Sequence, residues 1–163
     1  MRRMFTTAAL TATLTAAAFA FSTHAAQADS GVLQYKDAMR DFTPAISVFT
    51  NESQAFGDVA VTKPELACTD EAIQLAKRAR FMVGDLAGTA APEAMIATQS
   101  ALGDALAEIS AGMYAGCGSR TPLAATLAPA IAKAQRALID IDLYVNDGIV
   151  PGAGPAPAFG GGF

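Results

Sequence analysis

Residues 86–95 read LAGTAAPEAM and separate two stretches in which apolar residues recur every three or four positions. Gly88 and Pro92 are residue types that end helices or turn the chain. A turn this short makes the two flanking helices antiparallel neighbours. The stretch therefore predicts a helical hairpin, from which the rest of the fold can be built.

The chain has two cysteines, Cys68 and Cys117, and their midpoint falls beside Pro92. In a hairpin that turns at Gly88 to Pro92, positions equidistant from the turn lie level, so the two cysteines should meet. The same register places two further pairs level: Leu75 with Ile109, and Met82 with Leu102. A catalytic dithiol is usually a close pair such as Cys-x-x-Cys. We therefore predict a structural disulfide.

Helical spacing recurs in four stretches of the chain. The first stripe is Tyr35, Met39, Phe42, Ile46, Phe49, Ser53 and Phe56. The second is Ala72, Leu75, Ala79, Met82 and Leu86, and the third is Met95, Gln99, Leu102, Leu106, Ile109 and Met113. The fourth is Leu127, Ile131, Ala134, Leu138, Ile141 and Val145. With short turns between them and no alternating strand pattern, these stripes predict an all-α, up-down-up-down four-helix bundle.

Several residues mark the expected helix ends. Thr62 and Glu65 have the spacing of a capping box before the second helix, and Thr121 precedes Pro122 as the expected N-cap of the fourth. Residues 146–148, Asn-Asp-Gly, should end the fourth helix.

Two prolines, Pro44 and Pro129, fall inside the first and fourth helices. Each removes a backbone hydrogen bond and bends its helix. In an antiparallel bundle these helices are neighbours. The prolines therefore indicate either a shared waist or pocket, or two tolerated kinks.

The start of the chain is typical of a secretory signal peptide. Arg2 and Arg3 precede an apolar stretch over residues 5–21, and Ala26 to Ala28 form a small-x-small cleavage site. We expect residues 1–28 to be removed, residues 29–150 to form the bundle domain, and the Gly/Pro-rich residues 151–163 to be a disordered tail. The general secretory route fits better than twin-arginine export, and the predicted location is secreted or periplasmic.

Composition narrows the function classes. Without residues 1–28 the domain keeps 9 of the 11 basic residues and all 15 acidic ones, for a net charge of −6. That charge opposes binding to nucleic acid or to an anionic membrane, and no later stretch is apolar enough to insert in a bilayer. The single histidine, His24, lies in the segment expected to be cleaved. The domain would then lack the usual general base and the commonest metal ligand.

One group of residues has side chains that can ligate a cofactor. Four residues should lie at similar heights at the end of the bundle that holds the turn at Gly88 to Pro92: Tyr35, Met82, Met95 and Tyr144. Tyrosinate and thioether groups can ligate haem iron. The plainer interpretation is that the methionines fill the core and the tyrosines direct their hydroxyls to water.

The charged clusters are more typical of a solvated surface than of a catalytic or metal-binding site. Lys77, Arg78 and Arg80 form a basic cluster on the second helix, in which Lys77 and Arg80 fall at outward positions. Asp104 and Glu108 are one turn apart on the outward side of the third, but no neighbour in sequence completes a site. Residues 140–148 loosely resemble a calcium loop, yet the ligand spacing does not match the EF-hand pattern.

These observations predict a non-enzymatic secreted or periplasmic helical module, without catalytic residues, a metal or a bound cofactor, that binds a protein partner or an apolar ligand. The alternative is a haem or metal carrier that uses the tyrosines and methionines. A third hypothesis is an enzyme that relies on carboxylates alone.

Overall fold

The computed structural model describes the backbone of residues 9–152 and the side chains of residues 30–152. The chain divides into two compact units at Gln34 and Tyr35. In the first unit, residues 9–34 are helical. The second unit, from Tyr35 onward, is the helical bundle in which the candidate site lies.

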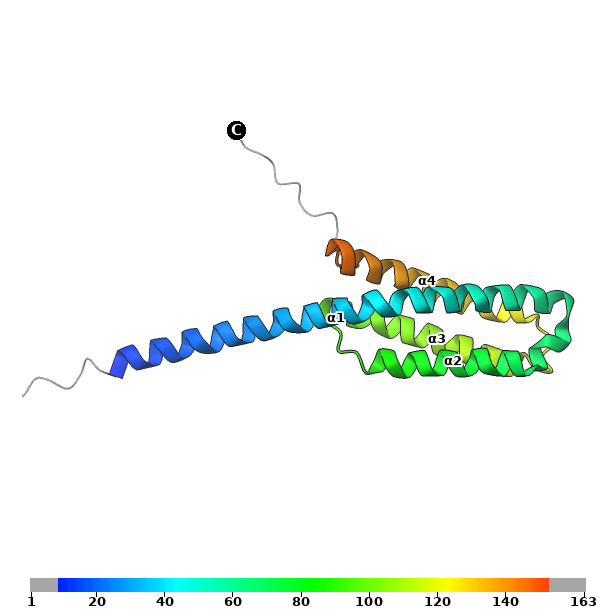
Figure 1. The fold of residues 1–163 in the computed structure, drawn as a ribbon, viewed down its shortest axis with the longest axis horizontal. Coiled ribbons are helices and arrows are strands. Elements are labelled where there is room, and N and C mark those ends of the chain that lie inside the picture. Colours follow the sequence, from blue (N-terminus) through cyan, green and yellow to red (C-terminus); the bar gives the residue numbers. More distant parts are fainter. Residues whose placement is uncertain (1–8, 153–163) are drawn as a thin grey trace, which may run out of the picture. The chain divides into compact units, whose positions relative to one another are not determined.

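Four α-helices and two short 3-10 helices follow one another in the described residues, without a strand among them (Figure 1). In chain order they are α1 (Ala9–Thr62), η1 (Pro64–Cys68), α2 (Asp70–Ala87), η2 (Glu93–Met95), α3 (Ile96–Gly116) and α4 (Leu123–Asp147). Within the second unit, successive helices are joined by short connections and run in opposite directions. The predicted up-down-up-down four-helix bundle is confirmed.

The four apolar stripes form one core. Among the side chains with 2% exposure or less are Phe49 on α1, Leu86 on α2, Leu106 on α3 and Ile141 on α4. Burial of each large apolar side chain contributes roughly 1.5–3 kcal/mol to folding. The other predicted stripe positions are buried as well, except for three that are partly exposed: Phe42, Met82 and Gln99.

The α2–α3 hairpin has the predicted register. Cys68 and Cys117 form a disulfide with their Cα atoms 4.6 Å apart. Further along, the Ser110 hydroxyl donates to the Ala76 carbonyl at 2.9 Å. Nearest the turn, the Gln99 side chain donates to the Leu86 carbonyl at 2.8 Å. Within each of these three pairs, the two residues are about equally far from the turn along the chain. The predicted disulfide and hairpin topology are therefore confirmed.

Two of the expected helix caps are wrong. α1 continues to Thr62, whose hydroxyl donates to the Val59 carbonyl, and α2 begins only after η1, at Asp70. The N-cap of α4 is Pro122 rather than Thr121, and the Thr121 amide donates to the Ser119 hydroxyl at 3.1 Å. The expected stop is confirmed: α4 ends at Asp147, and Gly148 adopts a left-handed φ of 71° that favours glycine.

Both internal prolines lie inside their helices, Pro44 in α1 and Pro129 in α4. They do not share one waist. Pro44 lines a groove of about 480 Å³ between α1 and α4, whereas Pro129 lines a different groove between α3 and α4. The prediction of a common pocket is wrong, because Pro129 is exposed on the side of α4 that faces α3.

The structure describes only parts of the predicted signal peptide and tail. α1 begins at Ala9, inside the segment expected to be cleaved, and the apolar part of a signal peptide is compatible with a helix. Cleavage after Ala28 stays a prediction. Most of the expected tail lies outside the described residues, which end at Gly152. Within the described part of the chain, no helix is both long and apolar enough to cross a membrane.

Candidate functional site

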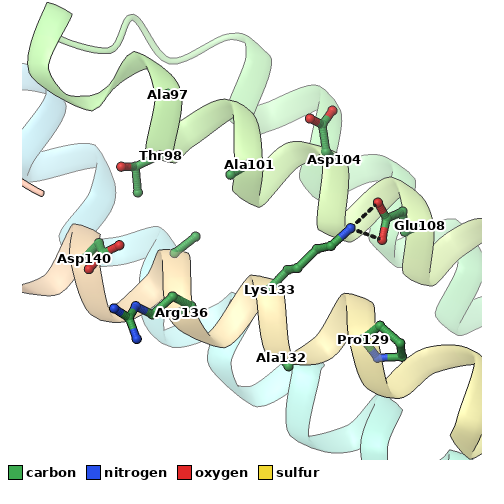
Figure 2. A pocket seen from close by; sticks show the side chains of 11 residues that line it. Ala97, Thr98, Ala101, Asp104, Glu108, Pro129, Ala132, Lys133, Arg136 and Asp140 are labelled. Carbon is green, nitrogen blue, oxygen red and sulfur yellow. Dashed lines mark hydrogen bonds and ion pairs between the residues drawn. The ribbon is translucent and has the colours of Figure 1, made fainter. Parts of the chain in front are cut away.

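The largest described groove runs between α3 and α4 and encloses about 750 Å³ (Figure 2). Its alanines at positions 97, 101, 132 and 137 leave the space between the two helices open. Charged side chains stand at its edges: Asp104 and Glu108 on α3, and Lys133, Arg136 and Asp140 on α4. We call this feature the α3–α4 groove.

The helical repeat aligns the lining residues along the groove. On α3, Ala97, Ala101, Asp104 and Glu108 are separated by steps of three or four, so they share one face. On α4, Pro129, Lys133, Arg136 and Asp140 do the same. Of these eight residues all are exposed except Asp140, which is half-buried. The groove is therefore an accessible surface formed by two parallel rows of residues.

An ion pair crosses the groove. The Lys133 ammonium group donates to both carboxylate oxygens of Glu108, at 2.7 and 2.9 Å, and the lysine stem spans the gap in Figure 2. The two side chains are 56% and 47% exposed, so this pair contributes at most about 1 kcal/mol to stability. The bridge separates Pro129 from the stretch of groove that begins at Asp104 and runs toward Ala97.

Three charges of the α3–α4 groove have no partner. Within residues 30–152, none of Asp104, Arg136 and Asp140 takes part in an ion pair or a side-chain hydrogen bond. They surround the alanine-lined part of the groove beyond the Lys133–Glu108 bridge. This part of the surface has an apolar floor and unneutralised charges of both signs, which is a composition suited to recognition.

The predicted tyrosines meet between α1 and α4. The rings of Tyr35 on α1 and Tyr144 on α4 pack edge to face with centroids 6.1 Å apart. The Tyr35 hydroxyl is buried and has no hydrogen-bond partner among the described residues. Burial raises the pKa of this hydroxyl to about 12, and Tyr144 adds to the shift. The Lys36 ammonium group lies 5.2 Å from the Tyr144 ring centroid.

The two predicted methionines belong to the core. Met95, at the start of α3, is fully buried, and Met82 on α2 is half-buried against the same cluster. Beside Met95, the Gln99 amide donates to the carbonyls of Leu86 and Thr89. These contacts support the interpretation of the methionines as packing residues.

The remaining sequence-predicted clusters are surface features. The Arg78 guanidinium pairs with Glu52 and lies 5.5 Å from the Phe49 ring centroid, while Arg80 lies 5.4 Å from that of Tyr114. In the acidic stretch at the end of α4, Asn146 donates to Asp142 at 2.8 Å within the helix. The described residues contain no group of three His, Cys, Asp or Glu side chains placed to hold a metal ion.

Sequence reasoning identified Asp104 and Glu108 but missed the groove. Lys133, which pairs with Glu108, and the unpaired Arg136 lie on the next helix, far along the chain. Positions equidistant from a turn lie level in a helical hairpin, which is how the disulfide was predicted. The same reasoning, applied to the turn after Gly116, places Glu108 level with Lys133.

Comparisons with known proteins add no further assignment. No protein-family model, curated protein or solved structure matches this chain.

Proposed function

We propose that this chain is an exported, non-enzymatic helical module that binds a protein partner through the α3–α4 groove. The observation that supports the proposal is the open groove with an alanine floor and three unpaired charges. Export is supported by the pattern of residues 1–28 and by the disulfide, since disulfides persist in oxidising compartments.

The shape and rim of the groove favour a protein over an apolar small molecule. A small-molecule site usually buries most of its ligand, with few polar groups. Here the floor is exposed and the edges carry five charged side chains. Two rows of small residues flanked by charges suit a helix or a helical surface, which is a common mode of recognition between proteins.

The alternative of a haem or metal carrier has less support. Met95 is fully buried in the core, Met82 packs against the same cluster, and neither methionine lines one of the described grooves. The measurement that separates the two proposals is the visible absorption spectrum of protein purified from the medium or periplasm. A Soret band would support the carrier and contradict the binding module as the main function.

Site-specific crosslinking tests the groove. A photoreactive amino acid at Ala101, in the groove floor, should yield a protein adduct in the native compartment. The same probe at Gln74, exposed on α2 and outside the described grooves, should not. The adduct at Ala101 should disappear with Asp104→Arg. Equal crosslinking from both positions, or an Ala101 adduct that persists in the Asp104→Arg variant, would contradict the proposal.

Export has its own test. N-terminal sequencing of the protein recovered outside the cytoplasm should begin at Asp29. Recovery of the intact chain starting at Met1 would refute the predicted cleavage.

A further inference from the structure

We infer that the partner in the α3–α4 groove is a second copy of this chain, docked face to face with its two-fold axis along the groove. The inference rests on the proposed function and names the partner of that same site. It is carried by how the charges are distributed over the two helices.

The exposed charges on the two sides of the α3–α4 groove differ in sign. The α3 edge carries two carboxylates, Asp104 and Glu108, whereas the adjoining stretch of α4 carries Lys133 and Arg136. Only Lys133 and Glu108 neutralise each other within one chain. The surface therefore has two carboxylates on α3 beside two basic side chains on α4, of which Asp104 and Arg136 are unpaired, and a third unpaired charge, Asp140, lies one turn beyond Arg136 on α4.

Symmetry determines how two such surfaces can meet. With the two-fold axis along the groove, α3 of one copy lies over α4 of the other, and acidic rows face basic rows. With the axis across the groove, each helix lies over its own counterpart, and like charges meet. Like charges at an interface are strongly unfavourable. The charge pattern selects the first arrangement, an isologous dimer.

The positions of the residues along the groove axis fit this arrangement. α3 and α4 are antiparallel, and the Glu108–Lys133 bridge fixes which positions lie level. One turn from the bridge, Asp104 on α3 lies about level with Arg136 on α4. A rotation about the groove axis keeps heights unchanged, so Asp104 of each copy would face the partner's Arg136. Two symmetric ion pairs would then satisfy Asp104 and Arg136, whereas Asp140 would lie level with the partner's Ala101 and stay unpaired.

The floor permits the close approach that these pairs need. Ala97, Ala101 and Ala132 are exposed and present only a methyl group to the opposing surface. Helices that meet through alanines can pack with their backbones closer than helices that meet through larger side chains.

A second copy also fits better than an unrelated basic helix. A uniformly cationic partner would satisfy Asp104 and Asp140 but would meet Lys133 and Arg136 with charges of the same sign. The groove is complementary to a surface that carries both signs in the opposite order, which is its own surface rotated by the two-fold axis.

Sedimentation analysis of the protein as recovered after export tests the inference. The wild type should form a concentration-dependent dimer whose affinity falls with added salt. Asp104→Arg and Arg136→Asp should each raise the dissociation constant about 100-fold, because each brings like charges together. Asp85→Arg, the same charge change at an exposed position of α2, should leave the dimer intact.

Mixing the two single variants gives the decisive measurement. Asp104→Arg chains and Arg136→Asp chains should each stay monomeric alone but form a heterodimer together, since every pair between them then has opposite signs. The double variant in one chain should dimerise again. Circular dichroism should show unchanged helix content in all of them.

The outcomes separate this inference from the proposed function. A wild type that stays monomeric, or single variants that fail to rescue each other, would overturn the inference. If the Ala101 probe still captures a different protein in that case, the groove would remain a binding site with another occupant. If the Ala101 adduct consists of two copies of this chain, both proposals are supported.

Discussion

Gly57 on α1 packs directly against the backbone of Ala124 on α4. A Cβ atom at position 57 would lie 3.2 Å from the Ala124 Cα atom and 3.6 Å from a Leu127 methyl carbon. The first neighbour is main chain in the opening turn of α4, which cannot rotate away. An alanine at position 57 would therefore require α1 and α4 to move apart by a few tenths of an ångström.

Gly57→Ala should destabilise the bundle although alanine is the better helix former. We expect a loss of about 1–3 kcal/mol from the forced shift of α1 against α4, reduced by the gain in helix propensity. The matched control is Gly84→Ala on α2, where an added Cβ meets nothing within 4 Å. That variant should gain up to about 1 kcal/mol. Urea denaturation of both variants measures the difference, and equal stabilities would contradict the close packing.

Removal of the disulfide should lower stability without changing the fold. Cys68 and Cys117 are both exposed, so Cys68→Ser with Cys117→Ser leaves no cavity. A bridge that closes a loop of 49 residues restricts the unfolded chain by about 4 kcal/mol in the chain-entropy model. We expect a lower melting temperature with unchanged helix content. Free thiols in protein isolated without reductant would refute the bridge itself.

Gln99 should be important for the α2–α3 turn. Its side-chain amide donates to the Leu86 carbonyl at 2.8 Å and to the Thr89 carbonyl at 2.7 Å at the end of α2, where the Leu86 carbonyl also accepts from the Thr89 amide at 3.1 Å. Gln99→Leu removes both bonds and should cost about 2 kcal/mol of unfolding free energy. Gln74→Leu, at an exposed position of α2, makes the same chemical change and should have little effect. A similar loss in both variants would argue against this role.

Tyr35 should make stability depend on pH at alkaline values. The pKa of its hydroxyl is raised from 10.0 to about 12 in the folded state, so the folded protein holds this proton more tightly than the unfolded chain. The contribution is complete below pH 10 and is lost as the pH rises through 12. Across that window, wild type should lose about 2–3 kcal/mol relative to Tyr35→Phe.

At neutral pH, Tyr35→Phe should match or exceed the wild type in stability, because the variant lacks a buried hydroxyl that has no partner. Chemical denaturation of both proteins at several pH values provides the measurement. A constant difference between them from pH 9 to pH 12 would show that the hydroxyl is not desolvated in solution.

Most of the fold could be predicted because its signals are local. Spacings of three and four residues mark the buried faces, and the symmetric placement of Cys68 and Cys117 about Pro92 fixes the hairpin. The helix ends were harder, since Thr62 and Thr121 are plausible caps by residue type. Their backbone and side-chain groups are instead satisfied within the preceding helix or turn.

The groove could not be derived from one helix at a time. Asp104 and Glu108 resemble an ordinary solvated pair until α4 is placed beside them, and their partners are contributed by a different part of the sequence. How far two helices diverge at their outer edges depends on side-chain sizes along the whole contact. Ala101 and Ala132 leave the space open, but neither alanine reveals this without its neighbour across the gap.

The position of the disulfide has a consequence for how the chain responds to proteolysis. The Gly88–Pro92 turn lies between Cys68 and Cys117 in the chain, so a protease that cuts this turn releases no fragment. The two pieces stay covalently joined and keep α2 beside α3. Such a nicked molecule would migrate as one species until it is reduced, and the bundle would survive an attack at this connection.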